Sequence, residues 1–134
     1  SKIAIKTANK NKKSLGCKNV EFFNQDIFMY NQTKADLILC NPPYLANHEI
    51  QNLEQSVKQN EPMSALTDFK NGISFYKYLI SNFNTLIKTN GIMLLEIPFS
   101  SVTQDIISIN ENFNSNKSVL YKDLEGKNRV IKIY

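Results

Sequence analysis

Four consecutive residues, Asn41, Pro42, Pro43 and Tyr44, directly follow the apolar run 35–40 and suit one kind of chemistry. Proline fixes its φ angle and has no backbone N–H, so two successive prolines make a stiff turn in which carbonyl acceptors outnumber donors. The side-chain oxygen of Asn41 and the carbonyl oxygen of Pro42 can then accept the two hydrogens of a planar NH2 group. The ring of Tyr44 can stack on that flat group. The motif therefore predicts a site for an amide or an exocyclic amino group.

A nitrogen of this type is a weak nucleophile because its lone pair is delocalised into the neighbouring π system. Holding both hydrogens fixes the direction of the lone pair, favours a pyramidal nitrogen and stabilises the positive charge that develops during attack. No strong general base is required if the proton leaves afterwards. The turn thus suits group transfer to a planar nitrogen, although four such residues can also form a purely structural turn.

The turn needs a scaffold, and the flanking sequence predicts alternating helices and strands. Residues 2–15 fit the end of an amphipathic helix that Gly16 closes, and residues 19–23 form a short β-rich run. Residues 35–40 are nearly all apolar, as in a parallel strand that is covered on both faces. The polar segment 45–71 is too long for a plain connection, and such segments are commonly functional.

The second half continues the alternation. Apolar residues recur at steps of three and four through residues 72–89, which predicts a helix that stops before Gly91. Four elements follow: a buried strand at 92–97, a helix at 101–113, and two terminal strands at 118–121 and 129–134. This order predicts an α/β doubly wound sheet with a C-terminal antiparallel hairpin. Ligands of such sheets bind beyond the carboxyl ends of the strands, and residues 41–44 lie at such an end.

In this setting the turn resembles the Asn-Pro-Pro-Tyr motif of S-adenosylmethionine-dependent methyltransferases that act on planar nitrogens. One large group modifies adenine N6 in DNA or RNA. The other includes the HemK/PrmC family, which methylates a glutamine side chain of peptide chain release factors. Four downstream segments resemble the glutamine group: residues 60–66 (Asn-Glu-Pro-Met-Ser-Ala-Leu), 71–76 (Asn-Gly-Ile-Ser-Phe-Tyr), 94–97 (Leu-Leu-Glu-Ile) and 123–130 (Asp-Leu-Glu-Gly-Lys-Asn-Arg-Val).

Departures from the family pattern are mild. Asn71 stands where Asp is usual, and Ile97 and Pro98 follow Glu96 where a Gly commonly comes soon after. The resemblance implies an α/β, Rossmann-like class I S-adenosylmethionine-dependent methyltransferase sheet that is N-terminally truncated and ends in an antiparallel hairpin. Residues 1–134 would then be the C-terminal portion of a catalytic domain.

The resemblance also implies a reaction and residues that perform it. The reaction is methyl transfer from S-adenosylmethionine to the side-chain amide nitrogen of a glutamine in a peptide chain release factor. Asn41, Pro42 and Tyr44 would be the catalytic residues. The same three, with Pro43 and Glu61, would bind the substrate.

Three residues are implied as cofactor contacts. Asp26 would accept a hydrogen bond from the adenine amino group of S-adenosylmethionine, with Ile27 beside the ring and Asn41 near the reacting end. The family carries a Gly-rich turn and a ribose-binding acid ahead of this segment, and neither occurs in these 134 residues. We therefore expect this chain alone to bind the cofactor weakly or not at all and to be inactive by itself.

Two other functions remain open. An adenine-N6 methyltransferase would flip its target base into the same kind of pocket, and a net charge of +4 is compatible with nucleic acid. However, Arg129 is the only arginine and is expected to anchor the hairpin, while segment 45–71 carries four acidic residues against two lysines. The other possibility is a scaffold without enzymatic activity.

Simpler roles also remain open for individual side chains. Asp26 could cap the segment that follows it, and Glu61 could anchor its loop. His48, the only histidine, lies in a polar loop and is expected to be solvated. Cys17 and Cys40 do not form a zinc-ligand spacing with it, so no metal is expected.

Length and composition fit one cytoplasmic domain. The chain has 134 residues, of which 42% are hydrophobic and 21% charged, which is enough to bury a core. No apolar run approaches the roughly 18 residues needed to cross a bilayer, and residues 1–13 lack the apolar stretch of a signal peptide. We therefore expect a cytoplasmic protein without a membrane partner.

Overall fold

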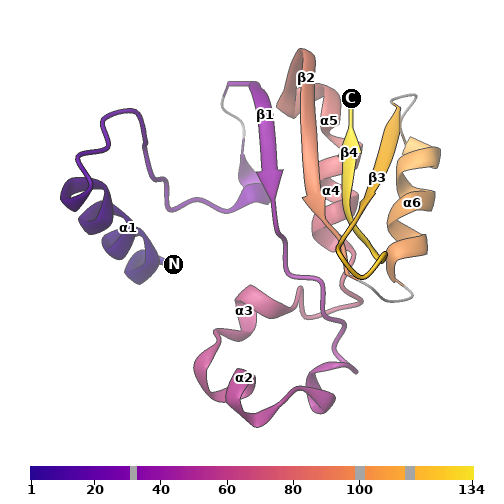
Figure 1. The fold of residues 1–134 in the computed structure, drawn as a ribbon, viewed down its shortest axis with the longest axis horizontal. Coiled ribbons are helices and arrows are strands. Elements are labelled where there is room, and N and C mark those ends of the chain that lie inside the picture. Colours follow the sequence, from indigo (N-terminus) through magenta and orange to yellow (C-terminus); the bar gives the residue numbers. More distant parts are fainter. Residues whose placement is uncertain (31–32, 99–101, 114–116) are drawn as a thin grey trace. The chain divides into compact units, whose positions relative to one another are not determined.

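The computed structural model describes residues 1–30, 33–98, 102–113 and 117–134. The chain forms two compact units, residues 1–32 and 33–134, and each is described by itself. The first unit contains helix α1 (Lys2–Ser14) and the short 3-10 helix η1 (Ile27–Met29), as Figure 1 shows.

Helix α1 ends as predicted, whereas the strand expected after it is absent. Gly16 adopts a left-handed φ of 65°, and the amides of Gly16 and Cys17 donate to carbonyls of the last helical turn. Residues 19–23 form no strand, and Phe23 is 60% exposed. A β-rich run becomes a strand only beside a partner strand, and the described part of this unit contains none.

The second unit is built on a four-stranded sheet (Figure 1). Its spatial order is β1-β2-β4-β3, formed by β1 (Ala35–Cys40), β2 (Ile87–Glu96), β4 (Asn128–Ile133) and β3 (Ser118–Lys122). Strands β1 and β2 are parallel, and the other two pairings are antiparallel. The predicted α/β class and the C-terminal hairpin are confirmed, with one parallel pair among the described strands.

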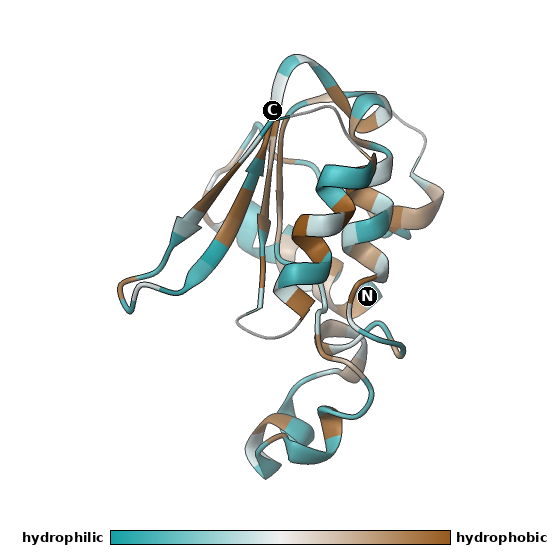
Figure 2. Cartoon of the chain, turned by 90° about the vertical axis from the view of Figure 1, so that its right-hand side faces the viewer, coloured by the Kyte–Doolittle hydropathy of each residue, from teal (hydrophilic) through white to brown (hydrophobic). Residues whose placement is uncertain are grey.

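The core lies between one face of this sheet and helices α4 (Ser74–Ser81) and α6 (Val102–Phe113). Alternate residues of β2 and β4 are buried there with apolar residues of both helices, and the ribbon in Figure 2 is brown, the colour of hydrophobic residues, along parts of the strands and helices. The fully buried set comprises Tyr76, Leu79, Ile80, Met93, Leu95, Ile97, Ile106, Ile131 and Ile133. Burial of this apolar surface supplies the main stabilisation of the unit.

Strand β1 departs from the expectation that both of its faces are covered. Leu37 and Leu39 are 47% and 68% exposed. Strand β1 stands at the end of the strand order and pairs only with β2 among the described strands. A continuous apolar run therefore does not establish which faces of a strand are covered.

The helix predicted at 72–89 is shorter and interrupted. Helix α4 ends at Ser81, Asn82 leaves helical geometry with ψ near 15°, and the four-residue helix α5 (Phe83–Leu86) follows. Strand β2 then begins at Ile87, which pairs with Ala35, rather than at residue 92. Apolar periodicity alone does not separate a helix end from the start of a buried strand, because both bury the same residue types.

Between β1 and α4 the chain forms a small helical region. It contains η2 (Ile50–Asn52), α2 (Gln55–Asn60) and α3 (Met63–Leu66), drawn in magenta in Figure 1. Among all the helices in the described ranges, none has the length and apolar character needed to span a membrane.

The β1–β2 pair depends on Gly91. A shift in register follows the Ala35–Ile87 pair, and Asn90 has a left-handed φ of 65°. A Cβ atom at position 91 would lie 2.8 Å from the carbonyl oxygen of Asp36 and 2.7 Å from the Ile87 side chain. The strands can therefore approach this closely only because position 91 has no side chain.

We expect Gly91→Ala to lower the free energy of unfolding by about 1–3 kcal/mol, because the added methyl group forces the two strands apart. Urea unfolding followed by circular dichroism measures the change. Thr89→Ala, on an exposed position of the same strand, is the control and should change stability by less than about 0.5 kcal/mol. Equal stability of the Gly91 variant and the parent chain would contradict this account of the strand pair.

Candidate active site at the end of strand β1

Residues 41–44 lie at the carboxyl end of β1, as the sequence analysis expects. Strand β1 ends at Cys40, whose register partner is Leu95, one residue before the end of β2. The two parallel strands therefore end at the same edge of the sheet. Ligand sites of α/β sheets lie at this edge.

A hollow of about 250 Å³ opens in front of the turn. It is lined by Asn41, Pro42, Tyr44, Leu45, Glu61, Ala65 and Leu66. The structure thus brings Glu61 and α3 to the turn, although residues 45–60 separate them from it in the sequence. Four of the five predicted substrate-binding residues line the hollow, and Pro43 is the one that does not.

Both proposed acceptors of the turn are available. Asn41 is exposed, Pro42 is buried and Tyr44 is half-buried. Within the described ranges, neither the side chain of Asn41 nor the carbonyl oxygen of Pro42 takes part in a hydrogen bond. A ligand in the hollow therefore would not have to displace an internal hydrogen bond to reach these oxygens.

Glu61 contributes a carboxylate to the same hollow. Its backbone amide donates to the carbonyl of Val57 at the end of α2, at 2.9 Å. Its side chain is exposed and makes no hydrogen bond or ion pair within the part of the chain that the structure describes. The backbone therefore anchors the loop, and the carboxylate remains open to a ligand.

Several backbone contacts fix the chain that leaves the turn. The amide of Leu45 donates to the carbonyl of Leu66 at 2.9 Å, and the amide of Asn47 donates to the carbonyl of Lys70 at 2.9 Å. The side-chain amide of Asn47 also donates to the carbonyl of Phe69 at 2.7 Å. Residues 45–47 are therefore tied to the end of α3 and to the loop that precedes α4.

Asp68 organises this loop, and sequence analysis assigned it no role. One of its carboxylate oxygens accepts hydrogen bonds from the amides of Lys70 and Gly72, and the other accepts from the amide of Ser74. Burial raises the pKa of Asp68, but the hydrogen bonds from Ser74, Gly72 and Lys70 lower it more, so it lies below its ordinary value. An Asp shortly before a Gly and a helix start was the signal that could have found it.

Tyr76 connects α4 to the same edge of the sheet. It is fully buried, and its hydroxyl donates to the backbone carbonyl of Glu96 at 2.7 Å. Burial raises the pKa of Tyr76, and the nearby Cys40, Tyr44 and Glu96 raise it further. The hydroxyl therefore remains a neutral hydrogen-bond donor beneath the turn.

Asp26 and Ile27 belong to the first unit. Asp26 is exposed, and its Oδ1 accepts a hydrogen bond from the amide of Phe28 at 3.0 Å, so it caps η1. Its second oxygen has no partner among the described residues. Ile27, the next residue in the sequence, is half-buried. A capping role and an open acceptor are therefore both present at Asp26, and an amino group of a cofactor suits that acceptor.

Other residues considered in the sequence analysis lie outside the site. Arg129 contacts Asp123 at 3.2 Å and anchors the hairpin, as expected, and His48 is exposed. No three His, Cys, Asp or Glu side chains of the described residues gather into a cluster that could hold a metal.

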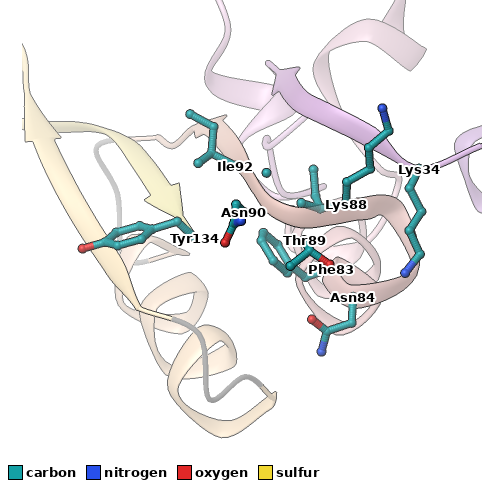
Figure 3. A pocket seen from close by; sticks show the side chains of 10 residues that line it. Lys34, Phe83, Asn84, Lys88, Thr89, Asn90, Ile92 and Tyr134 are labelled. Carbon is teal, nitrogen blue, oxygen red and sulfur yellow. The ribbon is translucent and has the colours of Figure 1, made fainter.

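A larger hollow of about 580 Å³ lies at the start of β2, where α5 and the end of β4 meet it. Figure 3 shows Lys34, Asn84, Asn90 and Tyr134 around this opening. It contains none of the predicted site residues. Size alone therefore does not identify the site, and the chemistry of the turn favours the smaller hollow.

Comparison with known proteins agrees with the motifs. Residues 1–132 match a family model described as a methyltransferase domain. The release factor glutamine methyltransferase of Bacillus subtilis is 33% identical over 98% of this chain and 46% of its own length. The protein of the same name from Fusobacterium nucleatum is 35% identical over 96% of this chain and 36% of its own. The bifunctional methyltransferase of Rickettsia typhi is 35% identical over 77% of this chain and 20% of its own.

The chain thus spans less than half the length of these relatives. The match to the family model spans residues 1–132, and residues 41–66, which carry the turn and the small hollow, lie within that range. The resemblance to release factor glutamine methyltransferases is confirmed, and the chain belongs to the methyltransferase domain family.

Proposed function

We propose that the complete protein carrying this chain transfers a methyl group from S-adenosylmethionine to the side-chain amide nitrogen of a glutamine in a peptide chain release factor. The observation that carries the proposal is the hollow at the end of β1, where Asn41, Pro42, Tyr44 and Glu61 meet. The relatives from Bacillus subtilis and Fusobacterium nucleatum, both release factor glutamine methyltransferases, support the choice of substrate.

Asn41 and Pro42 orient the reacting nitrogen in this proposal. The side-chain oxygen of Asn41 accepts one N–H of the glutamine amide, and the carbonyl oxygen of Pro42 accepts the other. The lone pair then points out of the plane that contains the two acceptors. Both oxygens also stabilise the positive charge that grows on nitrogen, and the proton leaves after attack.

Tyr44 and Glu61 complete the substrate site. The half-buried ring of Tyr44 packs on the flat amide and limits its rotation, with Pro43 stiffening the turn between them. The open carboxylate of Glu61, which also lines the hollow, accepts an N–H from the substrate peptide.

Asp26, Ile27 and Asn41 are the proposed cofactor contacts. S-adenosylmethionine, when bound, supplies a sulfonium methyl group that a nitrogen lone pair can attack. The second oxygen of Asp26 accepts a hydrogen bond from the adenine amino group, while the first oxygen continues to cap η1. Ile27 offers apolar surface to the adenine ring.

The substrate is tested by incubating the complete protein with labelled S-adenosylmethionine and, in parallel, a release factor, unmethylated DNA and tRNA. We expect label only on the release factor, at one glutamine located by mass spectrometry. As a control, a release factor in which asparagine replaces that glutamine should carry no label. Label only on nucleic acid would overturn the proposal in favour of an adenine-N6 methyltransferase.

Asn41→Ala should lower kcat by a factor that corresponds to about 2–4 kcal/mol, because one preorganised acceptor is lost from the transition state. Asn84→Ala, an exposed asparagine in α5, is the matched control and should leave kcat within about twofold, since it lies outside the hollow. Near-normal turnover of the Asn41 variant would remove this residue from the mechanism.

Asp26→Asn should weaken cofactor binding by about tenfold or more, measured by isothermal titration of the complete protein with S-adenosylmethionine. Asparagine is an equally good helix cap, so the hydrogen bond to Phe28 is retained while the open acceptor becomes an NH2 donor. Glu21→Gln, an exposed acid in the same unit, is the control and should leave the affinity unchanged. Unchanged affinity in the Asp26 variant would leave it only the capping role.

A further inference from the structure

We propose that Asp68 is a positioning residue for the methyl-transfer site: by gathering the backbone of residues 70–74, it holds Gly72 against Tyr44 and so fixes the turn. This inference rests on the proposed function, because it assigns a purpose to a residue that does not line the hollow. Asp68 acts through Gly72 and touches neither substrate nor cofactor.

The carboxylate of Asp68 accepts three hydrogen bonds from backbone amides. Its Oδ1 accepts from the amides of Lys70 and Gly72, each at 2.9 Å, and its Oδ2 accepts from the amide of Ser74 at 3.0 Å. Three donors converge on one carboxylate, and hydrogen bonds to a charged acceptor are the stronger kind. The path of residues 70–74 is therefore determined by the position of this side chain.

The loop of residues 70–74 lies directly against the turn at Tyr44. Gly72 is buried with a φ of 81°, and a Cβ atom at this position would overlap the carbonyl oxygen of Tyr44. The amide of Asn47 donates to the carbonyl of Lys70 in the same loop. A displacement of residues 70–72 is therefore transmitted directly to the backbone at Tyr44 and just beyond it.

Asp68 is also linked to the core through helix α4. Ser74 is the first residue of α4, so the carboxylate of Asp68 also meets the amino end of that helix, where negative charge is favourable. Two residues later, the buried Tyr76 is bonded to the carbonyl of Glu96. Asp68 thus joins a rigid helix to a loop that supports the turn.

The hairpin provides a matched control for the test. The Oδ1 of Asp123 accepts from the amides of Glu125 and Lys127, and its Oδ2 accepts from Arg129. This is the same three-donor pattern, but it closes the β3–β4 turn rather than the loop beside the motif. Asp→Asn at either position removes one charge and replaces one acceptor by a donor.

In steady-state methylation by the complete protein, we expect Asp68→Asn to lower kcat by about tenfold with KM changed less than about twofold. Asp123→Asn should leave both constants within about twofold, whatever it costs in stability. Equal losses of kcat in the two variants would reduce Asp68 to a structural role and overturn the proposal.

A second readout does not depend on activity. In 1H–15N spectra, Asp68→Asn should shift the backbone amides of Leu45 and Asn47 and the side-chain NH2 of Asn41, whereas Asp123→Asn should shift hairpin signals only. Unshifted motif signals in the Asp68 variant would refute positioning. Shifted signals without methylation of a release factor by the parent protein would support positioning and contradict only the proposed function.

A milder variant covers the case in which Asp68→Asn does not fold. Ser74→Ala removes a hydroxyl that helps to lower the pKa of Asp68, but it keeps the backbone donor. We expect the same motif signals to move in the same direction and kcat to fall by about threefold. Unmoved signals together with unchanged kcat would overturn the proposal.

Discussion

The site depends on one constraint, which is the absence of backbone donors at Pro42 and Pro43. A turn without proline offers as many backbone N–H donors as carbonyl acceptors. These groups can hydrogen-bond to each other, or to ligand acceptors and donors alike. Here the prolines leave the oxygens of Asn41 and Pro42 without internal partners in the described structure. An open pair of acceptors selects a ligand that brings two donors on one atom, as an amide NH2 group does.

Such a turn is useful only if it is held still, and two layers of the structure do this. The apolar core between the sheet and helices α4 and α6 fixes the end of β1 and buries Tyr76 beneath it. Hydrogen bonds from residues 45–47 to the loop before α4 then determine the direction in which the chain leaves the turn. In the proposed mechanism, the core supplies rigidity, and the loop supplies the exact placement that orientation of a weak nucleophile requires.

Sequence patterns predicted well wherever an element is defined by its own residues. The apolar run 35–40, the glycine that closes α1 and the Gly-containing hairpin turn all appear at the expected positions. The failures arose where a neighbour decides the outcome. Residues 19–23 have strand propensity but no partner strand among the described residues of their unit, and the periodic run 72–89 is divided because Ile87 pairs with Ala35. Propensity is local, whereas strand pairing is not.

The amino-acid sequence by itself determined the chemistry of the turn, because proline geometry and the asparagine oxygen are properties of the residues at 41–43. It also determined the kinship with methyltransferases through motifs spread along the chain. Only the tertiary structure decided that Glu61 lines the same hollow as the turn and that Gly72 lies against the backbone of Tyr44. These contacts join segments far apart in the chain, and their geometry follows from how the helices and strands pack rather than from any local pattern.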